Sequence, residues 1–252
     1  YDKTVNISPA DGGFCIIEGT AKGSTVVLMD FRGVVMKKHV SANYELALHA
    51  SYMGGYFYVI SAIYTTDRDT GASIFSGYSM TRPDYPYTSA SNSYRSGGYY
   101  NSVGLGKVIK GIRKSFSAVV INTGDKAFLH DRRVSEEMKM QELPAGAEVL
   151  SISDYYMTEN DNNYFRVYRR DTYSERTLIA SVSPKAEYSD HTLGEVAFST
   201  GKSVRIRTYA NATTRSIRNS AGSTKNIKGL CYVNGELYII RDTAIYKYIP
   251  ES

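Results

Sequence analysis

The feature that most constrains the fold is a recurring pattern of short β-forming runs separated by polar turns. Each unit of the pattern takes about 42 of the 252 residues, and the units begin near residues 13, 48, 110, 150, 193 and 228. In each unit, β-branched and aromatic residues flank turn residues that tolerate a positive φ, which is typical of β-hairpins. The pattern predicts a chain of consecutive, locally paired antiparallel sheets.

The last unit shows this pattern most clearly. In GLCYVNGELYIIRDTAIYKYI (229–249), an Asn-Gly turn joins two runs and an Asp-Thr turn leads into a third. Alternation in the middle run places Leu237 and Ile239 on one face and Tyr238 and Ile240 on the other. A strand that lies between two stacked sheets requires apolar residues on both faces in this way.

A period of 40–50 residues with about four short strands in each unit is typical of the blades of a β-propeller. We therefore predict an all-β fold, a β-propeller of six blades within a range of five to seven. A β-sandwich, or a pair of small β domains, is the alternative architecture. Residues 1–252 are predicted to form a single domain, which matches neither the WD40 nor the kelch signature.

The chain resembles a β-propeller in rhythm along its whole length, and one hairpin adds a more specific resemblance. The run DRDTGASIF (67–75) is similar to the Asp-box hairpin of sialidase-type propellers. Asp69, Gly71 and Ser73 stand where that motif has its Asp, its Gly and its small hydroxyl residue, while the Trp of the motif is missing and one copy is present. In that family the box is a structural turn, so the resemblance implies a fold and not a catalytic site.

Two segments carry helix-like patterns, RRVSEEMKMQEL (132–143) and, more weakly, ANYELALHASYM (42–53). The two cysteines, Cys15 and Cys231, occupy like positions in the first and last units. In a closed ring those units would be neighbours, so that the thiols would either pack at equivalent core positions or form a disulfide.

Catalytic motifs are absent from the sequence, and we predict neither catalytic residues nor a cofactor. The chain contains no H-E-x-x-H, G-x-S-x-G or G-x-G-x-x-G, and its four histidines (His39, His49, His130 and His191) are scattered and predicted to be structural. Asp67 and Asp69 in TDRDTG (66–71) are weak candidates for calcium ligands, as are the acids of ENDNN (159–163). Asx residues are common in tight turns, which is the competing interpretation.

The segment 76–102 is predicted to be a long loop that binds a ligand. It contains no Ile, Leu, Val or Phe, but six of the 23 tyrosines, and Pro83 and Pro86 exclude a regular central strand. Its Tyr, Ser, Gly and Asn content resembles that of an antibody paratope, where stiff aromatic rings provide contact area. The predicted ligand-binding residues are Arg82, Tyr85, Tyr87, Tyr94, Arg95, Tyr99 and Tyr100. The alternatives are that the loop folds back on the domain, packs against another subunit or is disordered.

Charge is distributed unevenly along the chain. The net charge is +5, and residues 101–252 hold the whole excess, with 22 Lys and Arg against 17 Asp and Glu. The stretch 208–228 is basic and free of acids, but it lacks interleaved aromatic residues and any RNA- or DNA-binding motif, so a nucleic-acid partner is not expected. No apolar run is long enough to cross a bilayer, and membrane insertion is not expected.

These observations predict a non-enzymatic binding module that recognises a cell-surface glycan or protein receptor. Viral tail and adhesin head domains are similar in presenting Tyr- and Ser-rich loops on a rigid β scaffold, and the similarity implies an extracellular or virion-surface location. Two alternatives stay open. The first is a glycan-cleaving propeller of the sialidase or glycosidase kind, and the second is a self-associating structural subunit of a ring.

Overall fold

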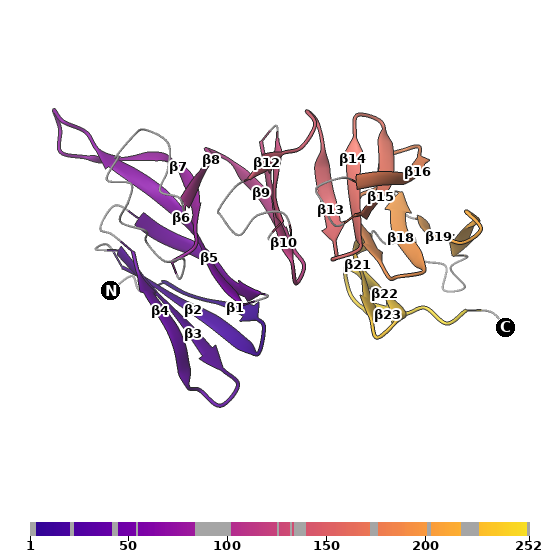
Figure 1. The fold of residues 1–252 in the computed structure, drawn as a ribbon, viewed down its shortest axis with the longest axis horizontal. Helices are drawn as coiled ribbons and strands as arrows, with labels where there is room; N and C mark the ends of the chain where they lie inside the picture. The colour runs from indigo at the N-terminus through magenta and orange to yellow at the C-terminus, as the bar shows by residue number, and fades with distance from the viewer. Residues whose placement is uncertain are drawn as a thin grey trace. The chain divides into compact units, whose positions relative to one another are not determined.

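The computed structural model describes residues 4–20, 23–41, 45–53, 55–83, 102–124, 126–131, 133, 140–171, 176–200, 203–217 and 227–250. Every regular element in these ranges is a β-strand, and they contain no helix. No helical segment capable of crossing a membrane is found among these residues. The strands form six antiparallel sheets, each built from strands that follow one another along the chain (Figure 1).

The first three sheets contain four strands each, and hydrogen bonds join neighbouring strands. Sheet 1 consists, from edge to edge, of β1 (Thr4–Ala10), β2 (Gly13–Thr20), β3 (Gly23–Asp30) and β4 (Val35–Val40). Sheet 2 consists of β5 (Glu45–Met53), β6 (Tyr56–Thr66), β7 (Ser73–Thr81) and β8 (Ser102–Gly106). Sheet 3 consists of β12 (Gln141–Glu142), β11 (Ala127–Asp131), β10 (Ala118–Thr123) and β9 (Ile109–Lys114).

The other three sheets are built in the same manner. Sheet 4 consists of β13 (Glu148–Ile152), β14 (Tyr156–Asp161), β15 (Tyr164–Arg170) and β16 (Arg176–Val182). Sheet 5 consists of β17 (Ser189–His191), β18 (Glu195–Thr200), β19 (Ser203–Thr208) and β20 (Thr214–Ile217). Sheet 6 consists of β21 (Ile227–Val233), β22 (Glu236–Arg241) and β23 (Ile245–Lys247).

The predicted all-β class and the six repeated units are therefore confirmed. The chain packs into two compact units. Unit 1 covers Tyr1–Ile112 and Phe128–Gln141, and unit 2 covers Arg113–Ala127 and Glu142–Ser252.

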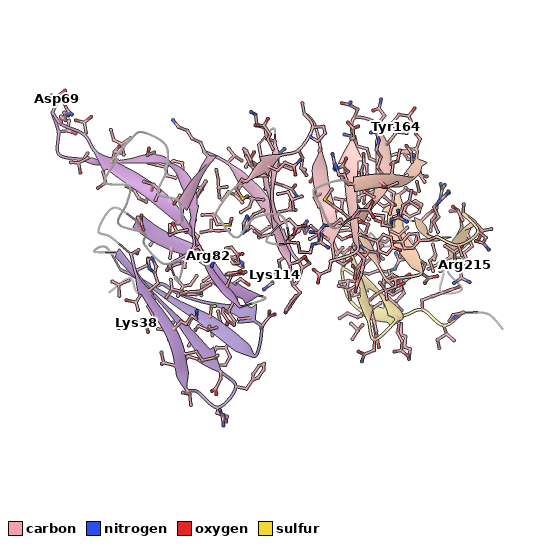
Figure 2. The ribbon with its side chains drawn as sticks, viewed as in Figure 1. Lys38, Asp69, Arg82, Lys114, Tyr164 and Arg215 are labelled. Carbon is pink, nitrogen blue, oxygen red and sulfur yellow. The ribbon has the colours of Figure 1, made fainter. Side chains whose placement is uncertain are left out.

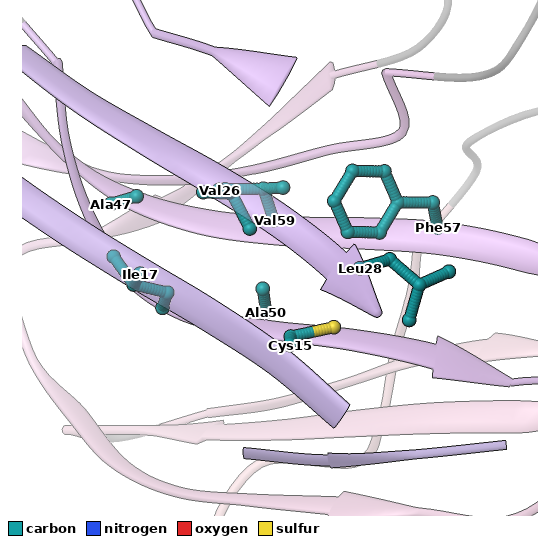
Figure 3. Close-up of a cluster of buried hydrophobic side chains, with 8 residues drawn as sticks. All are labelled: Cys15, Ile17, Val26, Leu28, Ala47, Ala50, Phe57 and Val59. Atoms are coloured by element: carbon teal, nitrogen blue, oxygen red, sulfur yellow. The ribbon is translucent and has the colours of Figure 1, made fainter. Parts of the chain in front are cut away.

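One core cluster of unit 1 lies between sheets 1 and 2. Its buried side chains come from β2, β3, β5 and β6 (Figure 3), and they are Cys15, Ile17, Val26, Leu28, Ala47, Ala50, Phe57 and Val59. The small side chains of β5 allow this strand to approach β2 and β3 closely. Two side chains of β1 donate hydrogen bonds to carbonyl groups of β5, with Asn6 Nδ2 lying 3.0 Å from the oxygen of Leu48 and Ser8 bonding to that of Ala50.

The weak helix-like pattern over 42–53 does not correspond to a helix, because residues 45–53 form β5. A β-bulge between Ala47 and His49 shifts the register against β6 by one residue. Ala47 and Ala50 consequently point to the same face although they are three positions apart, and both are buried in the core of unit 1. A bulge thus imitates the spacing of an amphipathic helix. The other helix-like pattern, 132–143, lies mostly outside the described residues, and its Gln141 and Glu142 form β12.

The core of unit 2 includes an apolar layer on each side of β18. Val196 and Phe198 pack with residues of sheet 4, where the rings of Phe165 and Phe198 stack with their centroids 4.8 Å apart. Ala197 packs on the opposite side with residues of sheet 6. A strand covered on both faces needs apolar residues at successive positions, which explains the run VAFS. In β22, Leu237 and Ile239 are buried in the same layer, as the alternation predicted.

Polar residues assigned to turns or loops from the sequence lie partly within strands. Glu159 and Asn160 belong to β14 and are buried, so they form no calcium loop. The side-chain amide of Asn160 accepts from the backbone NH of Ala186 at 3.0 Å and donates to its carbonyl oxygen at 2.7 Å. Asn122 of β10 bonds in the same two ways to Val149. A buried amide of this kind satisfies both backbone groups of a neighbouring segment.

Candidate functional site

Three tight turns of unit 2 have the same construction. They join the first two strands of sheets 3, 4 and 5 along the chain and span residues 115–118, 153–156 and 192–195. Each is closed by a backbone hydrogen bond of 2.8 Å from the amide of its first residue to the carbonyl of its fourth. We refer to them as the three turns.

A hydroxyl group stabilises each of the three turns from inside. In each one, the side chain of the first residue accepts hydrogen bonds of 3.1–3.3 Å from the amides two and three positions later. The first residues are Ser115, Ser153 and Thr192, and Ser and Thr favour turns through such local bonds. The backbone of each turn is therefore held in one conformation.

Each turn carries a large apolar side chain that is exposed, at the second position in the first and third turns and at the third position in the second turn. The side chains of Phe116, Tyr155 and Leu193 have 59%, 60% and 68% of their surface accessible. We refer to these three residues as the turn surface. Single exposed apolar residues are ordinary on proteins, whereas adjacent ones on a rigid support are typical of an interaction surface.

Hydrogen bonds connect neighbouring turns to one another, so the three turns lie side by side. The Asp154 carboxylate accepts from the Ser117 amide at 2.9 Å and from the Ser117 hydroxyl at 2.8 Å, which connects the first turn to the second. The Tyr156 hydroxyl donates to the carbonyl oxygen of Leu193 at 3.4 Å, which connects the second turn to the third.

Arg170 forms hydrogen bonds to the first two turns. This buried residue ends β15, and its guanidinium donates to the carbonyl group of Ser153 and lies 3.5 Å from the hydroxyl of Ser115. Its backbone amide donates to the carbonyl oxygen of Tyr155 at 2.7 Å. At the third turn the equivalent backbone bond comes from Tyr209, whose amide donates to the carbonyl oxygen of Gly194 at 2.9 Å.

A buried polar network lies beneath the second turn. Both ring nitrogens of His191 contact serine hydroxyls, Nδ1 at 2.9 Å from Ser151 Oγ and Nε2 at 2.8 Å from Ser153 Oγ. The hydroxyls of Ser151 and Ser189 also bond to that of Thr158, at 2.7 Å and 2.6 Å. A Ser–His contact resembles the nucleophile and base of a hydrolase, but here both ring nitrogens bond to hydroxyls, and the Ser153 hydroxyl caps its own turn. The network therefore positions the turn.

Electrostatics fix the charge states of this network. Burial, reinforced by the charge of Arg170, lowers the pKa of His191 to about 4, so the imidazole is neutral at physiological pH. Burial also opposes the ionisation of Asp154, but hydrogen bonds from Ser117 and Ser115 and the charge of Arg170 outweigh it, and the pKa of this carboxyl is below its usual value. The link between the first two turns is thus a charged acceptor bound by two neutral donors.

The ligand-binding residues predicted from the sequence are in a different part of the chain. Arg82 is buried in unit 1, with 5% of its surface accessible and its guanidinium carbon 3.7 Å from the ring centroid of Tyr56 (Figure 2). The other six predicted residues, Tyr85, Tyr87, Tyr94, Arg95, Tyr99 and Tyr100, lie outside the described residues. Residues 76–81, assigned to the same loop, form the end of β7, where Met80 is fully buried. Met80 shows that a segment without Ile, Leu, Val or Phe can still contribute to a core, since Met is itself a common core residue.

The hairpin with the weak calcium candidates is closed by its own hydrogen bonds. The Asp67 carboxylate accepts from the amides of Asp69 and Thr70 at 3.0 and 2.8 Å and from the Thr70 hydroxyl at 2.9 Å. Asp69 lies at the tip of this β6–β7 hairpin (Figure 2). The turn resembles the Asp-box in outline, but Asp67 and not Asp69 supplies the accepting carboxylate. In the described part of the chain, no group of three or more His, Cys, Asp or Glu is arranged to hold a metal ion.

The structure also shows where the two cysteines, Cys15 and Cys231, lie. Cys15 is fully buried in the core of unit 1. Cys231 is half-buried on β21 in unit 2, and burial together with the charge of Asp190 raises the pKa of its thiol. Neither cysteine forms a disulfide, so the disulfide alternative is wrong.

The turn surface was missed from the sequence, although a signal for it is present. The first residues of the three turns are 38 and 39 residues apart, each is Ser or Thr, and each is followed by Phe, Asp-Tyr or Leu. Aligning the units at their first turn, rather than at their apolar runs, would have identified these positions.

Comparisons with known proteins support the fold but assign the chain to no family. No family model and no curated protein matches the sequence. Among solved structures, the chain is similar to Hsv2 of Kluyveromyces lactis, with a TM-score of 0.56 and 11% identity over 99% of this chain and 75% of that one. It is similar to Hsv2 of Kluyveromyces marxianus, with a TM-score of 0.56 and 9% identity over 100% and 74%. It is also similar to the computationally designed Ika8 protein, with a TM-score of 0.53 and 11% identity over 98% and 71%.

Hsv2 is a β-propeller protein. Together with the six antiparallel sheets, this similarity confirms the predicted class, and the fold is that of a six-bladed β-propeller without a specific family signature.

Proposed function

We propose that this protein is a non-enzymatic binding module that docks a protein partner on the turn surface. The observation that carries the proposal is the repetition of one design in three consecutive sheets, with a hydroxyl-capped turn that presents Phe116, Tyr155 or Leu193 to solvent. Exposing three large apolar side chains on connected turns brings no benefit to the isolated fold. Their burial by a partner would be favourable, at roughly 25 cal/mol per Å² of apolar surface.

Rigidity of the support favours this proposal further. The three turns are fixed by their own hydroxyl caps, by Asp154 and by Arg170, so that a partner would not have to order them on binding. Aromatic and aliphatic anchors on a fixed backbone are the residues that dominate protein–protein affinity. A protein partner is preferred over a free sugar because Phe116 and Leu193 offer no hydrogen-bonding side-chain groups.

The finer part of the proposal is that the partner is a receptor on a cell surface, as the tyrosine-rich segment suggested, and that the protein acts outside the cell or on a virion. The glycan alternative rests on residues 82–100. Replacing residues 85–100 with a Gly-Ser linker would abolish binding to glycan arrays and to whole cells if that segment carries recognition. Unchanged binding would remove the segment from the proposal and leave the turn surface.

Site-specific photo-crosslinking tests the turn surface directly. Tyr155 is replaced by a photoreactive phenylalanine analogue, and Tyr164 serves as the matched control. Tyr164 is also an exposed tyrosine of sheet 4, with 46% of its surface accessible, but it lies at the β14–β15 hairpin, at the opposite end of β14 (Figure 2). Irradiation in native-host extract should yield a discrete protein adduct from position 155 and none from position 164. Equal adducts from both positions, or none from position 155, would contradict the proposal.

A further inference from the structure

Sheet 5 contains two arginines whose surroundings differ from those of the paired arginines in sheet 4. Arg205 and Arg207 lie two positions apart on β19, so they point to the same face of the sheet and their Cα atoms are about 7 Å apart. Both side chains are half-buried. Their cross-strand partners on β20 are Ser216 and Thr214, and the Arg207 guanidinium donates to the Thr214 hydroxyl at 3.3 Å.

Three arginines of sheet 4 and its flanks are matched by carboxylates. Arg166 lies 2.9 Å from Asp161, Arg169 lies 3.0 Å from Asp171, and Arg176 pairs with Glu159. Among the described residues, neither Arg205 nor Arg207 forms an ion pair with a carboxylate. Two half-buried positive charges on one face repel each other and are partly removed from water, and an anion between them would relieve both costs.

Comparison of sheet 5 with sheet 4 explains how this pair arises. The hairpins β14–β15 and β18–β19 have the same length and register, with Asp161 opposite Tyr164 and Thr200 opposite Ser203. Counting from the hairpin, Arg205 is equivalent to Arg166. The cross-strand partner of Arg166 is Glu159, whereas that of Arg205 is Phe198.

The equivalent positions of sheet 5 lack both acids that neutralise the arginine of sheet 4. Thr200 replaces Asp161 at the end of the hairpin strand, and Arg207 replaces Tyr168, whose hydroxyl lies 3.5 Å from Arg166 Nη1. The same scaffold position thus holds an internally neutralised arginine in one sheet and, in the next, an arginine pair whose cross-strand partners on β18 and β20 include no acid.

We infer that the Arg205–Arg207 pair, with Thr214 and Ser216, forms a binding site for a tetrahedral oxyanion, a phosphate or sulfate group. Guanidinium groups match the oxygens of such an anion with two donors each, and the adjacent hydroxyls add further donors. The site lies on β19 and β20, is independent of the turn surface and adds a second, charge-based contact to the protein.

Anion titration followed by NMR tests the site. Sodium sulfate and sodium phosphate, compared with sodium chloride at equal ionic strength, should produce saturable shifts of the amide resonances of residues 203–208 and 214–217. The Arg205→Gln/Arg207→Gln variant should lose these shifts. The Arg169→Gln variant, which removes an exposed and carboxylate-paired arginine of sheet 4, should retain them. Absence of saturable shifts in the wild-type protein, or equal shifts in the double variant, would overturn the inference.

A second variant keeps both arginines and tests whether the missing carboxylate of sheet 5 leaves them available to an anion. Thr200→Asp places a carboxylate where sheet 4 has Asp161, which lies 2.9 Å from Arg166. This variant should weaken sulfate binding at least tenfold while the protein stays folded, and unchanged binding would contradict the role assigned to the missing acid. Titration with a sulfated disaccharide and with a sugar monophosphate distinguishes the two sources, since the lower dissociation constant identifies the group that the site prefers.

Discussion

Lowering the pH from 7 to 5 should destabilise the wild-type protein by about 2 kcal/mol relative to its His191→Asn variant. Burial lowers the pKa of His191 from 6.5 to about 4, so the unfolded state binds a proton between these pH values and the native state does not. The contribution of the neutral imidazole is fully present above pH 6.5 and decreases as the pH falls towards 4. Its full size is about 3 kcal/mol, of which about two thirds is lost at pH 5.

Urea unfolding at pH 7, 6 and 5 measures this effect as a difference between the two proteins. Burial raises the pKa values of Asp190 and Glu159, and their titration changes stability with the opposite sign, but both carboxyl groups are present in wild type and variant and cancel. NMR titration of the imidazole provides an independent value, with an expected midpoint near 4. A midpoint near 6.5, or a pH dependence that is the same in both proteins, would refute the argument that the ring is neutral and buried beneath the second turn.

Three further predictions concern the scaffold. Gly13→Ala should lower the free energy of unfolding in urea by about 3 kcal/mol or more, because the added Cβ would lie 1.9 Å from the backbone oxygen of Met29. Gly12→Ala should lower it by about 1 kcal/mol, because Gly12 has open space around it but a φ of +73°. Equal losses in the two variants would contradict this prediction. Phe198→Ala should lose about 3–5 kcal/mol by leaving a cavity against Phe165, while the exposed Leu178→Ala should change stability by less than about 0.5 kcal/mol. Addition of calcium or of a chelator should leave the melting temperature unchanged, since the Asp67 carboxylate is occupied by Thr70 and Asp69, and a calcium-dependent rise would show that the β6–β7 hairpin binds the ion.

The sheets could be predicted from the sequence because each is built from local hairpins. In β21–β22, the Asn-Gly turn has φ values of +51° and +79°, which sets the register of the two strands without help from distant residues. The pattern was ambiguous at β5, where the bulge at Ala47 gave two buried alanines the spacing of a helix. Bulges depend on the partner strand, so a single segment does not reveal them.

The candidate site was harder to predict because its residues come together only through stacking of the sheets. Ser117 and Asp154 are 37 positions apart, as are Tyr156 and Leu193, and these contacts follow from the length of the repeat. The sequence directed attention to the tyrosines of 76–102 through composition alone. The alternation of Val204, Arg205, Ile206 and Arg207 was visible as a strand with one basic face, but the absence of acids opposite to it required the register of β18 and β19.

The affinity of the partner captured at position 155 tests the central claim most directly. Surface plasmon resonance with the purified partner would compare the wild-type protein with Phe116→Ser, Tyr155→Ser, Leu193→Ser and the control Tyr164→Ser. Each substitution on the turn surface should weaken binding at least tenfold, which corresponds to about 1.4 kcal/mol, and the control should leave it unchanged. Affinity that is insensitive to the three turn residues, or that falls equally with Tyr164→Ser, would contradict the account.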